Sequence, residues 1–169
     1  IIASFISVIK YKTTKQEDFI IMLGKDFTNV QVNTPIDKTF VSNFMKSDYL
    51  LKIINSDASK IVDDKILKIS TLVKKSNIAF ISIGTNDIKN QIKVDESLKA
   101  ISFDDDIINR KIEILLFNVK EIVNQLKVIN PNINIYLLKI DYFLNYKNEK
   151  IEAYINLINQ NYKNITNVI

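Results

Sequence analysis

Short apolar runs rich in β-branched residues alternate along the chain with longer stretches of helical spacing. The short runs predict strands at Ile1–Val8, Asn29–Asn33, Ile78–Ile83, Ile133–Ile140 and Asn167–Ile169. Near-continuous Val and Ile runs are typical of strands buried on both faces, as in a parallel sheet. The pattern therefore predicts an α/β fold, in which right-handed crossovers give a three-layer α/β/α sandwich around a central parallel sheet.

The stretches between these strands repeat apolar residues at the spacing of one helix face. They predict helices over Gln16–Leu23, Ser59–Lys75, Asp105–Ile129 and Ile151–Tyr162. Gly24 fits the position just after the first helix, and Asn130-Pro131 would stop the third. Residues 33–59 have mixed patterning, so we expect a long loop there with one short helix. No repeat or linker interrupts this order, and the first residue is Ile1 rather than Met. We therefore expect one domain over residues 1–169, within a longer chain.

Composition excludes several kinds of active site. The 169 residues include no cysteine and no histidine. Without cysteine there is no disulfide, thiol nucleophile or zinc–thiolate site. Without histidine the commonest general base is missing, so these residues alone cannot complete a Ser-His-Asp or Cys-His site. We also expect no cofactor and no metal ion. The acidic run Asp104-Asp105-Asp106 precedes a helical stripe and is interpreted as a helix cap.

The charge pattern argues against a nucleic-acid partner. The chain has 23 basic and 19 acidic residues, a formal net charge of +4, and every basic residue except Arg110 is a lysine. Nucleic-acid readers usually enrich arginine, whereas these lysines are interleaved with acidic residues, which indicates a solvated surface. No apolar run approaches the roughly 18 residues of a membrane-spanning helix. The abundance of Ile, Asn and Lys, which have A/T-rich codons, indicates an AT-rich bacterial genome.

The most informative segment, Gly84-Thr85-Asn86-Asp87, follows the predicted strand Ile78–Ile83. In open α/β sheets, ligands bind at the carboxyl ends of the strands. A glycine there lets the backbone turn sharply, and the Asn86 amide can stabilise a developing negative charge as an oxyanion donor does. The same residue types are favoured in ordinary turns, so spacing alone leaves both interpretations open.

Residues Ile81–Asp87 resemble the Gly-x-Asn-Asp block of the SGNH or GDSL hydrolases, a family of esterases and lipases. Residues Leu72–Asn77 before the strand, and Asn118–Leu138 and Ile151–Tyr162 after it, also resemble segments of this family. The resemblance covers roughly residues 29–169. It implies an SGNH-like, flavodoxin-like fold with Gly84 and the oxyanion donor Asn86 in the active site. It also implies an acyl-ester or carbohydrate-ester ligand and favours an extracellular or cell-surface location.

The chain departs from the family at its other blocks. The nucleophile belongs to a Gly-Asp-Ser block after the first strand, which the predicted elements place near residues 2–7. One register there keeps Ser4 as the nucleophile without its Gly and Asp, and another places Phe5 on it. The second block should supply a glycine after Asn29–Asn33, but Thr34–Thr39 contains none. The last block, Asp-x-x-His, would lie beyond Ile169.

Three interpretations stay open. The first is a catalytically degenerate SGNH-like domain that binds a ligand or a protein partner within a larger bacterial assembly. The second is an active ester hydrolase that uses Ser4 and an Asp-x-x-His block beyond Ile169. The third is a flavodoxin-like binding domain, although no Gly-rich phosphate loop follows the first predicted strand. Tyrosines either line an acyl or sugar pocket or pack with wet hydroxyls, at Tyr142, Tyr146, Tyr154 and Tyr162. We expect Asn86 at the carboxyl edge of the sheet, close to the end of the first strand.

Overall fold

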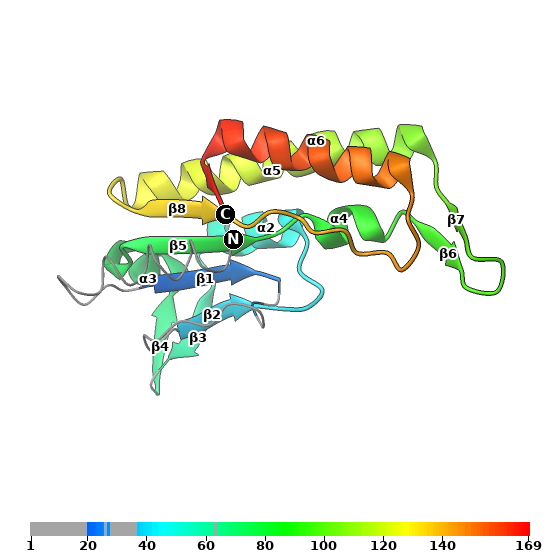
Figure 1. The fold of residues 1–169 in the computed structure, drawn as a ribbon. Coiled ribbons are helices and arrows are strands. Elements are labelled where there is room, and N and C mark those ends of the chain that lie inside the picture. The colour runs from blue at the N-terminus through cyan, green and yellow to red at the C-terminus, as the bar shows by residue number, and fades with distance from the viewer. Residues whose placement is uncertain (1–19, 26, 28–36, 63) are drawn as a thin grey trace.

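The computed structural model describes residues 20–25, 27, 37–62 and 64–169. Its centre is a five-stranded sheet with the order β2-β1-β5-β8-β9 (Figure 1). The strands are β1 (Ile20–Gly24), β2 (Asp37–Val41), β5 (Ile78–Ser82), β8 (Asn134–Leu137) and β9 (Asn167–Val168). Every pair of neighbours in this sheet is parallel. The predicted α/β fold with a central parallel sheet is therefore confirmed.

Both faces of the sheet are buried. Leu23 and Ile81 point into the larger core, which also contains residues of the helices α2 (Ser47–Asn55), α3 (Ile69–Lys75), α5 (Asp105–Ile129) and α6 (Glu149–Ile165). Met22 and Phe80 point to the opposite face, where they cluster with Phe27. Because alternate side chains are buried on each face, these strands read as continuous apolar runs instead of an alternating pattern.

The long helix α5 has the bounds that its apolar spacing predicts. Asp104 caps it, because its carboxylate accepts hydrogen bonds from the N–H groups of Asp106 and Ile107, at 2.9 and 3.1 Å. The acidic run thus opens the helix, as predicted. Asn130 follows the last turn and directly precedes Pro131, which cannot continue a helix.

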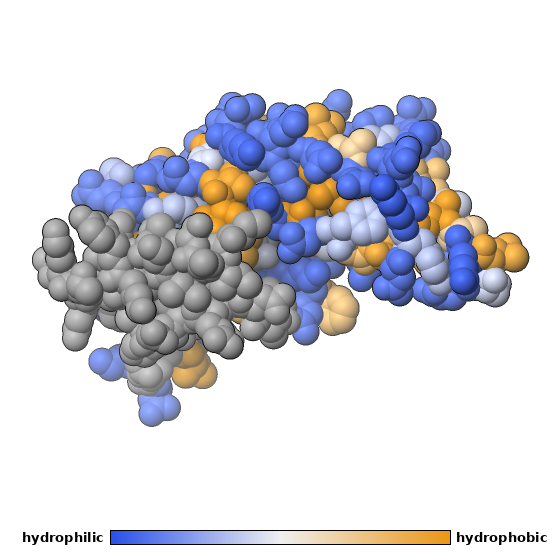
Figure 2. All heavy atoms as spheres, viewed as in Figure 1, coloured by the Kyte–Doolittle hydropathy of each residue, from blue (hydrophilic) through white to orange (hydrophobic). Residues whose placement is uncertain are grey.

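The predicted helix Ile151–Tyr162 is confirmed and belongs to the longer α6. It buries one face against the core, and hydrophilic side chains dominate its outer surface (Figure 2). In the part of the chain that the structure describes, no helix combines the length and apolar character needed to cross a membrane.

The predicted helix Ser59–Lys75 is wrong in its first half. Residues 59–68 form an antiparallel hairpin of β3 (Ser59–Val62) and β4 (Lys65–Lys68), and only Ile69–Lys75 is helical. Asp57 explains this boundary, because its carboxylate accepts hydrogen bonds from the N–H and the hydroxyl of Ser70, both at 2.9 Å, in the first turn of α3. Ile66, which the helical spacing of this segment predicts to be on its buried face, is instead 77% exposed.

The predicted helix Gln16–Leu23 is also wrong, because Ile20–Gly24 is the strand β1. A short apolar run such as Ile20–Leu23 fits a buried strand as well as a helix, and only pairing with β2 and β5 decides between them. Residues 16–19 and the predicted strands Ile1–Val8 and Asn29–Asn33 lie outside the described residues.

The remaining elements complete the layer around the sheet. The irregular stretch before Ser59 contains the expected short helix, α2, but also the strand β2. The helix α4 (Thr85–Lys89) follows β5, and a second hairpin of β6 (Lys93–Asp95) and β7 (Ala100–Ser102) connects α4 to α5. Figure 1 shows this hairpin extending away from the sheet beyond α4.

Candidate active site

The carboxyl ends of β1 and β5 lie side by side at one edge of the sheet (Figure 1). Gly24 is in register with Ser82, and the N–H of Lys25 donates to the Ser82 carbonyl at 2.6 Å. Gly84 follows at the start of α4, which carries Asn86. Asn86 therefore follows the strand that neighbours β1, at the edge where α/β folds bind ligands.

Gly84 occupies a position with no room for a side chain. It has a φ of +113°, and a Cβ there would lie 2.5 Å from the Tyr162 hydroxyl and 2.6 Å from Ile140 Cδ1. Tyr162 is fully buried, and its hydroxyl donates to the Ile83 carbonyl at 2.9 Å. Burial, followed by the negative charge of Asp87, holds the pKa of Tyr162 well above its usual range, so this hydroxyl remains a donor. Gly84 thus permits the close packing of α6 behind the site.

The Asn86 side chain is bonded to the turn that joins β2 to α2. Its amide nitrogen donates to the carbonyl of Asn43 at 2.9 Å and to that of Met45 at 3.2 Å. A side-chain amide has two hydrogens, so these two bonds use its full donor capacity. An oxyanion would have to displace one of these carbonyls in order to bind this amide.

Asp87 holds the beginning of α2. Its carboxylate accepts hydrogen bonds from the N–H of Ser47, at 3.1 Å, and from the Ser47 hydroxyl, at 2.5 Å. The Asn118 amide in turn donates to that hydroxyl at 3.0 Å, and Ser47 and Asn118 are both buried. A carboxylate at a helix N-terminus is favourable for the helix dipole.

Ser47 and Asn118 were not identified from the sequence. The available signal was Asn118, which is a polar residue on the buried stripe of α5 between Leu115 and Val119. Such a residue needs a hydrogen-bond partner, but the sequence does not say which one.

The environment of Asp87 gives a pH prediction. Burial is the main cause that raises the pKa of Asp87 above its usual value, the charge of Asp48 adds to it, and the Ser47 hydrogen bonds oppose it. A carboxyl group with a raised pKa binds its proton more tightly in the folded state. Its stabilising contribution is therefore full below the unfolded pKa, near 3.8, and is lost as pH rises through the folded pKa.

We therefore expect the unfolding free energy of the wild type to fall, relative to that of Asp87→Asn, as pH rises through this window, and the difference to stay constant above it. Urea unfolding of both proteins between about pH 3 and pH 8 measures the difference. The matched control is Asp95→Asn. Hydrogen bonding from Ser97 lowers the pKa of the exposed Asp95. The unfolding free energy of the wild type should therefore fall, relative to that of Asp95→Asn, as pH falls. Parallel curves for wild type and Asp87→Asn would contradict the prediction.

The segment that follows β1 differs from the one expected to carry the nucleophile. The expected position near residues 2–7 depends on the predicted helix Gln16–Leu23, but Ile20–Leu23 of that segment belongs to the strand β1. The residues directly after β1 are Lys25-Asp26-Phe27. Ser4 lies outside the described residues, so its role as nucleophile stays a prediction.

Asp37–Thr39, the end of the segment expected to carry the second block, belong to the strand β2. The strand that pairs with β1 is β2, and Ser42–Lys46 follows it without a glycine. This turn is internally bonded, since Met45 N–H donates to the Ser42 carbonyl at 3.1 Å and Phe44 N–H donates to the Ser42 hydroxyl at 3.4 Å. Ser42 N–H donates to the Gly24 carbonyl at 2.9 Å, which places the turn beside the end of β1.

The tyrosines form connections within the protein. The Tyr146 hydroxyl donates to the Glu96 carboxylate at 2.6 Å, and the Tyr154 hydroxyl donates to Asp105 at 2.5 Å, which raises the pKa of Tyr154 to about 12. The Tyr142 hydroxyl donates to the Tyr146 carbonyl. With Tyr162 bonded to the Ile83 carbonyl, all four hydroxyls have protein partners, which favours packing over an acyl or sugar pocket.

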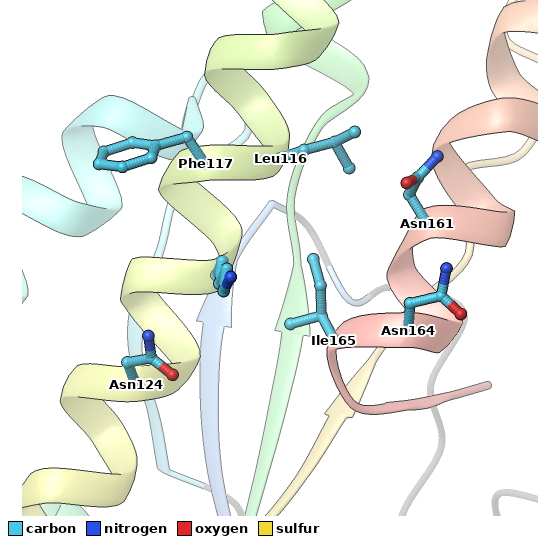
Figure 3. Close-up of a pocket in the computed structure, with 7 residues that line it drawn as sticks. Leu116, Phe117, Asn124, Asn161, Asn164 and Ile165 are labelled. Carbon is cyan, nitrogen blue, oxygen red and sulfur yellow. The ribbon is translucent and has the colours of Figure 1, made fainter.

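A separate groove of about 370 Å³ lies between α5 and α6 (Figure 3). Its lining is Leu116, Phe117, Lys120, Asn124, Asn161, Asn164 and Ile165. This lining includes neither Gly84 nor Asn86 and offers amides and one lysine without an acid–base pair. Within the described ranges, no cluster of carboxylates is arranged to hold a metal ion.

Comparisons with known proteins identify the fold. No protein-family model matches the sequence, and no curated protein matches it either. A lipase structure from a goat rumen metagenome is similar, with a TM-score of 0.63 and 15% identity, over 90% of this chain and 80% of that one. A Streptococcus pneumonia protein described as a candidate platelet activating factor is similar with a TM-score of 0.52 and 15% identity, over 99% and 74% of the two chains. The chain thus has the SGNH-hydrolase-like α/β fold that its Gly84–Asp87 segment implied.

Proposed function

We propose that this chain is an SGNH-fold domain that does not hydrolyse esters and instead has a binding or structural role in a larger bacterial protein. The observation that carries the proposal is the end of β1 at Gly24. In the family that it resembles, Gly-Asp-Ser follows the first strand. Here the corresponding residues are Gly24-Lys25-Asp26, which keep the glycine and replace the aspartate and the nucleophilic serine. Asp26 has no hydroxyl for a general base to deprotonate.

The oxyanion donors support the same proposal. The turn after β2 has no glycine, and the Asn86 amide is bonded to the carbonyls of Asn43 and Met45. Loss of a single oxyanion donor typically lowers kcat by about 10²–10³-fold. A site in which the Asn86 amide is already bonded and the serine is missing therefore has little left to accelerate acyl transfer. The resemblance still implies an acyl-ester or carbohydrate-ester ligand, which this domain would bind without hydrolysing it. A cell-surface location and a protein partner belong to the same proposal.

We expect the natural full-length protein to leave short p-nitrophenyl esters at their background hydrolysis rate. We also expect a fluorophosphonate probe, which reacts with activated serines, to leave the protein unlabelled. Both results follow from the absence of a serine directly after β1. Ester turnover is followed by absorbance and labelling by intact-mass spectrometry, with an active serine esterase as the positive control.

The second candidate is an active ester hydrolase, and the fold shared with the goat rumen lipase favours it. It would use Ser4 as nucleophile, Asn86 and Gly84 in the oxyanion site, and a histidine beyond Ile169. A fluorophosphonate adduct on Ser4, with turnover lost in Ser4→Ala and in Asn86→Ala, would establish this candidate and overturn the proposal above.

A further inference from the structure

Asn86 and Asp87 of α4 form hydrogen bonds with the turn between β2 and α2. Asn86 donates to the carbonyls of Asn43 and Met45. Asp87 accepts from the N–H and the hydroxyl of Ser47. The contacts join residues about forty positions apart in sequence, so they fix the turn to the edge of the sheet instead of shaping it locally.

Three N–H groups of this turn are also engaged. Those of Phe44 and Met45 donate to Ser42, and that of Ser47 donates to Asp87. In the hydrolases that the chain resembles, the block after the second strand supplies an N–H to the oxyanion, and the asparagine of Gly-x-Asn-Asp supplies its amide. Here the Asn86 amide and the N–H groups of Phe44, Met45 and Ser47 have acceptors within the protein.

We infer that Asn43–Ser47 and Asn86–Asp87 form a closed lock, in which the polar groups of a former oxyanion site bind the protein itself and hold the β2–α2 turn in place. This inference rests on the proposed function and states what the retained Gly-x-Asn-Asp segment does in a domain without catalysis. The Asn86 amide acts as a positioning group whose target is the turn.

Burial explains why the lock stays closed. Met45 is only 4% exposed and its hydrogen bond to Asn86 is partly buried, so its carbonyl would lose a partner where water has limited access if Asn86 turned away. The bond to the Asn43 carbonyl is exposed. The neighbouring Phe44 is 86% exposed. The lock therefore separates the two side chains, keeping Met45 in the core and Phe44 outside it.

The test is amide hydrogen exchange of residues 43–48 in Asn86→Ala. Loss of both hydrogen bonds is expected to speed exchange there by about tenfold or more. Asn86→Asp should speed it at least as much, because a carboxylate would face two carbonyl oxygens. The matched control is Asn90→Ala, at the exposed end of the same helix, with exchange in the turn within about twofold of the wild type. Exchange in Asn86→Ala that equals the control would overturn the lock.

A second measurement uses the wild type, in case the variants do not fold. The Asn86 side-chain amide protons should exchange slowly in NMR spectra and keep their chemical shifts when dimethyl phosphate, a small oxyanion, is added. Saturable shifts of this amide would show that it is free to bind an oxyanion and would overturn the lock. Ester turnover on Ser4 would instead refute the proposed function, so the two failures are distinguishable.

Discussion

Gly24→Ala is expected to prevent stable folding of the domain. A Cβ at this position would lie 2.0 Å from the Ser82 carbonyl oxygen and 2.8 Å from the Ser82 carbonyl carbon. Both atoms belong to the backbone of β5, so no side-chain rotation relieves the clash. The φ of +119° adds strain, because residues with a Cβ rarely adopt it. We expect a loss of about 4 kcal/mol or more, against a total stability of about 5–15 kcal/mol for a typical domain.

Far-UV circular dichroism during urea unfolding measures this effect. The matched control is Lys25→Ala, which changes the neighbouring, partly exposed side chain and keeps the backbone bond from Lys25 N–H to Ser82. That variant should unfold within about 1 kcal/mol of the wild type. A Gly24→Ala protein with the wild-type urea midpoint would show that β1 and β5 do not approach in this way.

Gly84→Ala is expected to lower the unfolding free energy by about 3 kcal/mol. Here the clash is with the side chains of Tyr162 and Ile140, at 2.5 and 2.6 Å, and only the φ of +113° is a backbone problem. Because a hydroxyl can be removed, Tyr162→Phe should recover part of the loss. Alone, Tyr162→Phe should cost about 1 kcal/mol, since it leaves the Ile83 carbonyl without its partner.

A double-mutant cycle of Gly84→Ala and Tyr162→Phe isolates this contact. The two substitutions together should cost less than the sum of their separate effects, by about 1 kcal/mol. Strict additivity would mean that backbone strain at Gly84 accounts for the whole loss and that the Tyr162 hydroxyl moves aside freely.

The sequence was sufficient where a pattern was long and local. The bounds of α5 follow from its extended apolar stripe, from Asp104 at its start and from Asn130-Pro131 at its end. All three signals act within a few residues of the helix, so they do not depend on the rest of the fold.

The failures occur in short segments that depend on distant partners. Ile20–Leu23 becomes a strand because β5 pairs with it, and α3 begins at Ile69 because Asp57 binds Ser70. Ile66 is an exposed hairpin residue that pairs with Ile61 across β3 and β4, and its apolar character mimics part of a buried helical stripe. Periodicity alone identifies neither the pairing of β1 with β5 nor the hydrogen bonds between Asp57 and Ser70.

The candidate site shows the same division. The place of Gly84 and Asn86 after a buried strand could be predicted, because a local glycine turn marks the end of β5. The acceptors of the Asn86 amide could not, since Asn43 and Met45 lie 43 and 41 residues away in the sequence. The position expected for the nucleophile block depends on the predicted helix Gln16–Leu23, part of which is the strand β1, whereas Ile1–Val8 and Ser4 lie outside the described residues.

The two hydrogen bonds of the Asn86 amide also bear on attempts to engineer an esterase from this scaffold. Introducing a serine after Gly24 and a histidine within its reach would provide attack and proton transfer. The Asn86 amide would still be bonded to Asn43 and Met45 instead of to the charge that develops on the substrate. The β2–α2 turn would have to be rebuilt first, with a residue that lets its backbone N–H face the substrate. If the proposed function holds, the first change in such a design would therefore be to this loop rather than to a nucleophile.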